Sequence, residues 1–186
     1  IPYKLNSNLL YNIYLLKSLY RTRKLLIKER SKFDVLLTNE LDKSFPELKP
    51  FFNNMISSTL LYILEKYTNT KHIAAMKDYD SIRKISYGKF TYAKFAKLKE
   101  LAKNSVGFHN ENTDLLISTY VSIYNDFNNK IDPIEKQIST IIKVLNPRML
   151  TIPGIGEISA ATILSEYGDI KNFSSPNKML AFAGLE

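Results

Sequence analysis

A hydrophobic repeat in the second half of the chain limits the fold more than any other feature. Between residues 117 and 145, hydrophobic side chains recur at alternating intervals of three and four residues: Ile117, Tyr120, Tyr124, Phe127, Ile131, Ile134, Ile138, Ile141 and Leu145. This heptad spacing places them on one stripe of a long helix, as in a coiled coil. Pro133 lies inside the repeat, and we predict that it kinks the helix or splits it in two.

Residues 8–42 predict a second long helix, because they contain neither Gly nor Pro and leucines recur throughout. Pro46 and Pro50 should end it, since proline cannot continue a helix without losing a donor and clashing. We predict that the two long helices pack antiparallel as a coiled coil, either within one chain or between two chains. The stripe that would face the partner contains two arginines among its hydrophobic residues: Leu16, Leu19, Arg23, Leu26, Arg30, Phe33 and Leu37.

The segment between the long helices predicts a small helical knob. Short helices are expected at about residues 55–67, 71–77 and 80–87, and Thr91 can cap a further helix that stops at Gly107. No segment alternates as a strand would. The predicted fold class is therefore all-α, with residues 1–147 as a helical coiled-coil region and residues 148–186 as a separate helix-hairpin-helix segment.

The positive charge is concentrated in the first part of the chain. The net charge of the whole chain is +8. Residues 1–107 contain 20 Lys and Arg against 9 Asp and Glu, whereas residues 108–186 contain 6 against 9. Such an excess favours a polyanionic partner, because each phosphate contact releases counterions. A solubilising lysine-rich surface explains the same composition, and the charge alone does not separate the two.

Two basic segments are candidates for phosphate contacts. In residues 17–32, five cations step by four, three, four and four along one helix face, with Arg23 beside them: Lys17, Arg21, Lys24, Lys28 and Lys32. Residues 83–103 carry seven cations against Glu100, with Tyr87, Phe90, Tyr92 and Phe95 among them. Spaced cations suit a phosphate track, and aromatic rings can stack on unpaired bases. The alternative is a solvated face whose aromatic side chains belong to the core.

Several classes of site and location are excluded or disfavoured by composition. The chain has no Cys and only two His, so neither disulfides nor a Cys or His metal site is expected, and we predict no metal or cofactor. No apolar run approaches the ~20 residues that span a bilayer, and the first residues do not resemble a signal peptide. We therefore expect no membrane association. The first residue is not Met, from which we expect this sequence to be a piece of a longer protein.

The sequence "LTIPGIGEISAATIL" near the C-terminus is the best candidate for function. Pro153, Gly154 and Gly156 precede a helix expected at residues 157–167, whose first turns carry small residues. Free backbone N–H groups at a helix N-terminus bind phosphate. We predict a helix-hairpin-helix in which Gly154, Ile155 and Gly156 face a nucleic-acid backbone and Arg148 adds a positive charge.

This prediction also fixes the local structure of the hairpin. We expect a positive φ angle at Gly156, buried anchoring side chains at Ile152 and Ile155, and close helix packing at Ala160 and Ala161. A tight turn that touches no ligand is the alternative. A P-loop is excluded, because no Gly-Lys-Ser/Thr follows the glycines.

The C-terminal residues "TIPGIGEISAATILSEYGDIKNFSSPNKMLAFAGL" closely resemble the C-terminal domain of the DEDD-type insertion-sequence transposases, the bridge-RNA-guided recombinases. The shared features are the Pro-Gly-hydrophobic-Gly turn, the Ala-rich helix, Gly168-Asp169, Phe173 and the closing "AFAGL". Residues 18–48, which lead to "FPE", resemble the family's arginine-rich stretch after its nuclease-like domain.

The resemblance implies that the catalytic residues of the family lie outside this sequence. Family members carry metal-binding acidic residues in a RuvC-like domain, which would precede residue 1, and a serine nucleophile beyond the "AGL" segment. Divalent metal is thus expected in that N-terminal domain and not here. Ser175 stands before Pro176 and predicts a helix cap rather than the nucleophile.

The sequence as a whole predicts a transposase fragment that binds nucleic-acid backbone and mediates assembly during DNA transposition, without catalytic residues of its own. Expected partners are DNA, a structured guide RNA and a second copy through the coiled coil, in the bacterial cytoplasm on chromosomal DNA. Two alternatives remain open. One is a stand-alone helix-hairpin-helix DNA-binding module of the repair or recombination type, and the other is a structural coiled-coil dimerisation protein.

Overall fold

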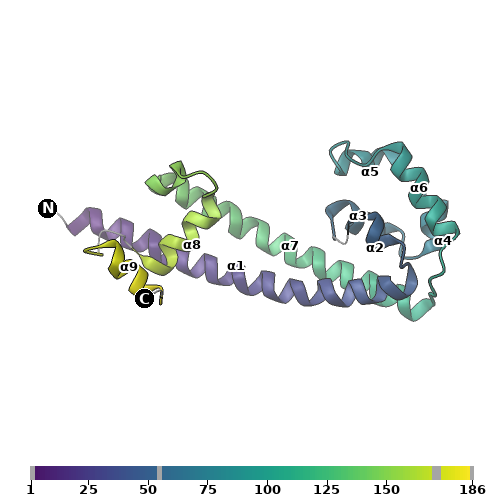
Figure 1. Cartoon of the computed structure of the whole chain (residues 1–186), viewed down its shortest axis with the longest axis horizontal. Helices are drawn as coiled ribbons and strands as arrows, with labels where there is room; N and C mark the ends of the chain where they lie inside the picture. Colours follow the sequence, from purple (N-terminus) through teal and green to yellow (C-terminus); the bar gives the residue numbers. More distant parts are fainter. Residues whose placement is uncertain (1–2, 54–55, 169–172, 185–186) are drawn as a thin grey trace. The chain divides into compact units, whose positions relative to one another are not determined.

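The computed structural model describes residues 3–53, 56–168 and 173–184, with the side chains of residues 3–8 excluded. These residues form helices and no strand, which confirms the predicted all-α class (Figure 1). The predicted long helix at 8–42 is present and extends further at both ends. The helices are α1 (Tyr3–Ser44), α2 (Leu48–Phe51), α3 (Ser58–Lys66), α4 (Thr70–Ala75), α5 (Tyr79–Ile85), α6 (Tyr92–Lys103), α7 (Glu111–Leu145), the 3₁₀ helix η1 (Arg148–Thr151), α8 (Glu157–Tyr167) and α9 (Pro176–Phe182).

The chain divides into two compact units. Unit 1 contains residues 1–27 and 129–186, and unit 2 contains residues 28–128. Each unit includes one part of α1 and one part of α7, and in each of them these parts lie side by side and antiparallel. The long-helix pairing predicted from the two hydrophobic stripes is therefore formed within the chain. The functional boundary predicted at residues 147 and 148 does not coincide with this division and stays a prediction.

In unit 2 the contact between α1 and α7 is aromatic and polar. The ring of Phe33 lies 6.2 Å from that of Tyr120 and 5.8 Å from that of Phe127. Arg30, which interrupts the hydrophobic stripe, donates a hydrogen bond of 2.6 Å to the Asn128 side chain and lies 5.1 Å above the Tyr124 ring. The stripe arginine is thus accommodated between the helices by specific partners.

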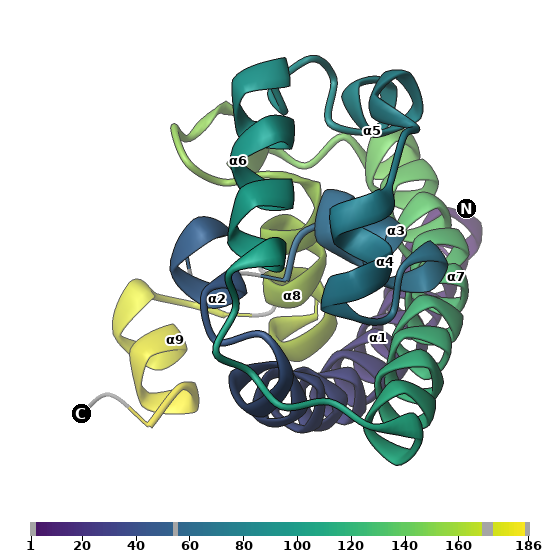
Figure 2. The same ribbon diagram turned by 90° about the vertical axis from the view of Figure 1, so that its right-hand side faces the viewer.

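Helices α2 to α6, here called the knob, complete unit 2. Most of them begin where a polar side chain can accept a hydrogen bond from the first helical turn. Ser57 accepts from the Leu60 N–H, Asn69 from the His72 N–H and Thr91 from the Lys94 N–H, so the predicted Thr91 cap is confirmed. Helix α4 packs against α6 and α3 against α5 (Figure 2).

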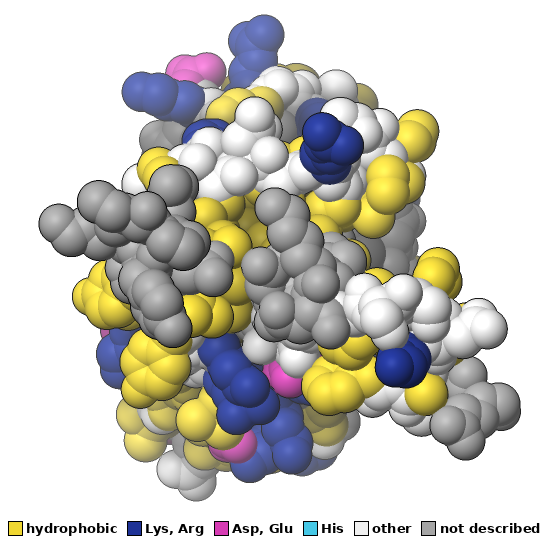
Figure 3. Space-filling model, turned by 90° about the vertical axis from the view of Figure 1, so that its left-hand side faces the viewer, with side chains coloured by type: hydrophobic (Ala, Val, Ile, Leu, Met, Phe, Trp, Pro, Cys, Tyr) yellow, Lys and Arg dark blue, Asp and Glu magenta, His cyan; other side chains and the backbone are white. Residues whose placement is uncertain are grey.

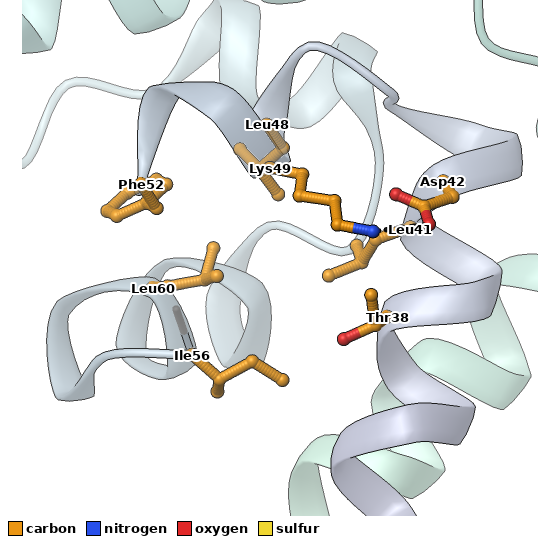
Figure 4. Close-up of a pocket in the computed structure, with 8 residues that line it drawn as sticks. All are labelled: Thr38, Leu41, Asp42, Leu48, Lys49, Phe52, Ile56 and Leu60. Atoms are coloured by element: carbon orange, nitrogen blue, oxygen red, sulfur yellow. Dashed lines mark hydrogen bonds and ion pairs between the residues drawn. The ribbon is translucent and has the colours of Figure 1, made fainter. Parts of the chain in front are cut away.

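A small cavity lies where the end of α1 meets α2 and α3 (Figure 4). Its volume is about 30 Å³, which is room for about two waters rather than for a ligand. Lys49 extends along it and forms an ion pair of 3.0 Å with Asp42, while Leu48 and Leu60 supply apolar walls. The cavity is therefore a packing feature of unit 2.

In unit 1 the core forms between the first part of α1, the last part of α7 and α8. Leu16, Ile138, Ile142, Ala160 and Ala161 are all fully buried in it. The burial of the two alanines shows that this face of α8 belongs to the core, while their predicted role in closing the hairpin stays a prediction. Arg23, the other arginine of the stripe, forms an ion pair of 2.6 Å with Glu135.

Of the two outcomes predicted for Pro133, a kink or a split, the split does not occur: α7 is one helix of 35 residues that contains Pro133. The kink stays a prediction. A proline in this position leaves the carbonyl four residues earlier, that of Asn129, without its helical donor. Both Pro133 and Asn129 are exposed, so water can take the place of the missing donor. The hydrophobic stripe on either side then holds the helix together.

Candidate nucleic-acid interface

The C-terminal hairpin is formed by a sequence of local stop and start signals in unit 1. Asn146 adopts a φ of 40° directly after the end of α7, and Pro147 prevents the helix from continuing. The single turn η1 follows. The Ile155 N–H then donates to the Ile152 carbonyl at 3.1 Å, which closes the loop before α8 begins at Glu157. The first element of the predicted helix-hairpin-helix is thus one 3₁₀ turn.

The two hairpin glycines serve different purposes. Gly154 has a φ of 88°, a conformation that favours glycine. Gly156 has a φ of −88° and a ψ of 179°, so the predicted positive φ at this position was wrong. A Cβ atom added at either glycine would meet no protein atom within 4 Å. Neither glycine is therefore required by packing, and only Gly154 is required by conformation.

The start of α8 differs from the side-chain-capped starts of α3, α4, α6 and α9, because Gly156 at its N-cap offers no side chain to accept a hydrogen bond. In the hairpin and the first turn of α8, five N–H groups have no acceptor among the described residues: those of Gly154, Gly156, Glu157, Ile158 and Ser159. The Glu157 carboxylate is held instead by α7, where it accepts a hydrogen bond from Ser139 and pairs with Lys143 at 3.6 Å. Unpaired N–H groups at a helix N-terminus are the usual donors to a phosphate.

The hairpin is anchored on one side only. Ile155 packs against the core of unit 1, as predicted, but Ile152 is 52% exposed and the prediction that it is buried was wrong. Its neighbours in the turn, Pro153 and Gly154, are also exposed. The loop therefore presents backbone and one apolar side chain to solvent.

The predicted cationic residues differ in how they are engaged. Arg148 is exposed on η1, and its guanidinium has no partner among the residues described. The ammonium groups of Lys17 and Lys24 in unit 1 and of Lys28 in unit 2 also have no partner among the residues described. By contrast, Arg23 is paired with Glu135 as part of the core contact between α1 and α7.

Arg21 connects the basic stripe of α1 to α8, but not to the hairpin. Its guanidinium lies 3.5 Å from the Glu166 carboxylate, and both side chains are largely exposed. Glu166 is nine residues beyond Glu157, about 13 Å along the helix axis. On the face of the molecule shown in Figure 3, Lys and Arg side chains alternate with acidic and hydrophobic ones. Within unit 1, the stripe residues Lys17, Arg21 and Lys24 therefore do not form one patch with the hairpin.

Ser139 and Lys143 were missed by sequence reasoning, although they position Glu157 and so the start of α8. The heptad repeat drew attention to the buried stripe of α7, whereas these two residues lie beside that stripe. Their spacing of four residues, which places both on one helix face, was the available signal.

Comparison with known protein families found one similarity, which lies in this segment. Residues 146–186 match the Transposase IS116/IS110/IS902 family. The match confirms the resemblance predicted for the C-terminal residues and supports a role related to transposition. It does not extend to residues 18–48, whose resemblance stays a prediction. No curated protein and no solved structure matches the chain.

The features that the transposase segment, residues 146–186, shares with the family have structural roles beyond the hairpin. Gly168 ends α8 with a φ of 72°. The rings of Tyr167, Phe173 and Phe182 form a triangle with centroid distances of 6.0, 5.6 and 5.5 Å, which holds α9 to the end of α8. Asp169 lies outside the described residues. Ser175 accepts a hydrogen bond from the Lys178 N–H, which confirms the predicted cap.

The transposase segment and the remaining described residues contain no group of three or more His, Asp or Glu side chains arranged to hold a metal ion. No described helix has the length and apolar character needed to cross a bilayer.

Proposed function

We propose that this chain binds the phosphate backbone of a nucleic acid, without reading its bases, as a non-catalytic part of a DNA transposition machinery. The observation that carries the proposal is Gly156. Its φ angle suits any residue, and a Cβ atom there would meet no protein atom within 4 Å. Since the protein itself has room for a side chain, the absence of one favours a close approach from outside. The match to a transposase family supports this assignment.

The hairpin would act as a phosphate-binding helix start. Its unpaired N–H groups lie at the positive end of the α8 dipole, where an anion is stabilised. Arg148 on η1 would contribute a charge-assisted hydrogen bond to the same phosphate or its neighbour. Such contacts fix the position of a nucleic acid but carry no sequence information. We therefore expect weak sequence preference.

The basic stripe of α1 would extend the contact. Lys17, Lys24 and Lys28 are the members whose charges are not engaged within the described part of the chain, and we propose that each of them contacts a phosphate. Each such contact should contribute about 0.7 to 0.9 to the slope of log affinity against log salt concentration. Arg23 is already paired with Glu135, so its substitution should change stability more than binding.

We further propose that the chain self-associates and that a structured guide RNA is among its ligands. The heptad stripe faces the chain's own α1 in each unit, so a second copy would have to use other side chains. In unit 2, exposed apolar residues remain on both long helices: Val35, Leu36, Leu115 and Leu116. Sedimentation of wild type and of Leu115→Glu tests this part, and a wild type that stays monomeric at all concentrations would contradict it.

The decisive experiment uses Gly156→Ala. The variant should unfold within about 1 kcal/mol of wild type, because its φ angle is allowed and the methyl group has space. Binding of a short fluorescein-labelled duplex of random sequence, followed by anisotropy, should weaken because the methyl group lies between backbone and phosphate. Arg148→Gln should weaken the same binding and lower its salt slope. Lys178→Gln removes another exposed cation of the transposase segment and serves as the matched control.

Three outcomes are distinguishable. Loss in Gly156→Ala and Arg148→Gln, but not in Lys178→Gln, supports the proposal. Equal affinity in all three variants would reduce the hairpin to a structural turn. If wild type binds neither duplex nor single strands at low salt, the proposal fails as a whole and the structural coiled-coil alternative takes its place.

A further inference from the structure

A groove in the knob of unit 2 has a chemical character that the hairpin lacks. It is lined by residues 51–53, by residues 57–59 at the start of α3 and by the turn that joins α5 to α6. Its volume is about 420 Å³, within the range of ~300–1,000 Å³ typical of small-ligand sites. Figure 2 shows the α5–α6 turn at the outer edge of the knob. Half of its lining residues are aromatic or cationic, and most of the others are small polar residues such as Ser57 and Thr59. The aromatic and cationic residues are Phe51, Phe52, Tyr87, Lys89, Phe90 and Lys94.

The floor of the groove is a preformed aromatic surface. The rings of Phe52 and Phe90 are stacked at 6.1 Å with an interplanar angle of 15°, and Phe51 meets both edge-on. Phe90 is buried, whereas Phe51 and Phe52 are only partly covered. A flat ring that enters the groove would therefore meet a rigid apolar face.

Tyr87 stands at the rim, directly after the end of α5. Its φ of 50° is the left-handed conformation of a Schellman cap, in which the Tyr87 N–H donates to the Lys84 carbonyl at 3.1 Å. Its side chain is 91% exposed, with no ring or hydrogen-bond partner among the described residues. The turn around it is well determined. The Gly88 N–H donates to the Arg83 carbonyl at 2.8 Å, and Ser86 both donates to that carbonyl and accepts from the Phe90 N–H. The protein thus holds a large aromatic side chain out into solvent.

The charge around Tyr87 is positive and locally uncompensated. Lys89 and Lys94 line the groove, and Arg83 and Lys84 precede the turn. None of these four forms an ion pair within the described residues, whereas Lys97 is paired with Glu100 and Lys99 donates to the Met76 carbonyl. The cations nearest the groove are therefore the ones available to an anionic ligand.

We propose that this groove binds a single-stranded nucleic acid, with an unpaired base stacked on Tyr87 and the flanking phosphates on Lys89 and Lys94. Aromatic side chains beside cations suit this ligand, because unpaired bases offer ring faces and the backbone offers charge. A duplex keeps its bases stacked and cannot use the groove in this way. The inference concerns unit 2 alone and does not depend on the hairpin in unit 1.

The test measures binding of the full chain to a short single-stranded oligonucleotide containing 2-aminopurine, whose fluorescence falls on stacking. Tyr87→Ala should weaken binding about tenfold, within the range for loss of one stacked base, and should abolish the fluorescence change. Tyr87→Phe should retain both. Tyr14→Ala removes another exposed tyrosine and is the matched control. Far-UV circular dichroism checks that each variant is folded.

Further measurements distinguish single-strand binding from binding of a duplex or of an acidic peptide. Lys89→Gln and Lys94→Gln should each lower the salt slope for the single strand, whereas duplex binding should not change in Tyr87→Ala. RNA and DNA versions of the oligonucleotide show which sugar is preferred, and Tyr87-dependent binding of either supports the proposal. Wild-type affinity of Tyr87→Ala for both single strands, an equal loss in Tyr14→Ala, or equal competition by an acidic peptide would overturn it. A Gly156→Ala variant that binds normally while Tyr87→Ala does not would refute only the hairpin function.

Discussion

Substitution of Gly107 by Ala should destabilise unit 2 through a steric clash with the backbone of α1. Gly107 lies in the loop between α6 and α7, next to the last turn of α1. A Cβ atom added there would lie 2.2 Å from the Ser44 carbonyl oxygen, 2.4 Å from the Ser44 carbonyl carbon and 2.9 Å from the Phe45 nitrogen. All three are backbone atoms, so no side-chain rotation relieves the contact. The loop has to move by about 1 Å to reach ordinary van der Waals distance.

That movement would break the hydrogen bonds that hold the loop to α1 and α2. The Phe108 N–H donates to the Lys43 carbonyl at 2.9 Å. The Glu47 carboxylate accepts from the Ser105 hydroxyl at 2.7 Å and from the Val106 N–H at 3.1 Å. Each lost bond costs about 0.5–1.5 kcal/mol, and those to the charged Glu47 cost more. We therefore expect Gly107→Ala to lower the free energy of unfolding by about 2–4 kcal/mol.

Urea unfolding followed by circular dichroism measures the loss, and hydrogen exchange of the Val106 and Phe108 amides locates it. Gly88→Ala is the matched control, because its φ is 77° but no atom lies within 4 Å of the added Cβ. It should cost only the conformational penalty, about 1–2 kcal/mol. If Gly107→Ala unfolds within 0.5 kcal/mol of wild type and Phe108 keeps its protection, the close approach of this loop to Ser44 is wrong.

Three further predictions concern Asp34, Glu47 and Ile138. Burial raises the pKa of Asp34, and the charge of Arg30 only partly offsets this, so ionised Asp34 opposes folding as pH rises above about 3.8. Asp34→Asn should therefore raise the free energy of unfolding at pH 7 and flatten the acidic part of its pH dependence, as measured by urea unfolding across pH. Burial alone would raise the pKa of Glu47, but hydrogen bonds from Ser105 and from backbone N–H groups outweigh this effect and lower the pKa. Ionised Glu47 therefore stabilises the fold, and this stability should be lost as pH falls below about 4.5. In Glu47→Gln the loss should be absent from the same urea titration. Ile138→Ala should destabilise by about 2–5 kcal/mol in thermal unfolding, because Ile138 is fully buried in unit 1, whereas the exposed Val144→Ala should change little.

The helices were predictable because their signals are local. The three-four spacing of α7 and the lack of Gly and Pro in α1 depend on the backbone geometry of a helix, and every stripe residue from Ile117 to Leu145 is buried or partly buried as the spacing requires. The Thr91 and Ser175 caps depend on contacts only three residues apart. The continuity of α7 through Pro133 was not predictable in this way, because it depends on the solvent exposure of one face of the helix.

The candidate site was predictable in position but not in detail. Cations at intervals of three or four residues look alike in a sequence, whether they face solvent or another helix. The structure separates them by their partners: Arg23 and Arg30 have Glu135 and Asn128 across the helix pair, whereas Lys24 has none within the described residues. Partners more than 90 residues away in the chain leave no local signal. The second basic segment divides in the same manner, since Phe90 and Phe95 are core residues while Tyr87 and Tyr92 are exposed.

The hairpin glycines illustrate why the same residue type can carry two kinds of constraint. Gly154 is needed for its φ of 88°, so Ala there should strain the loop by about 1–2 kcal/mol and weaken binding only through the distorted backbone. Gly156 has an ordinary φ, so any effect of Ala there has to come from the added methyl group itself. A stability loss confined to Gly154→Ala together with a binding loss in Gly156→Ala would therefore assign conformation to the first glycine and ligand access to the second. If both variants lose stability equally and their folded fractions bind alike, ligand access has no part in selecting Gly156.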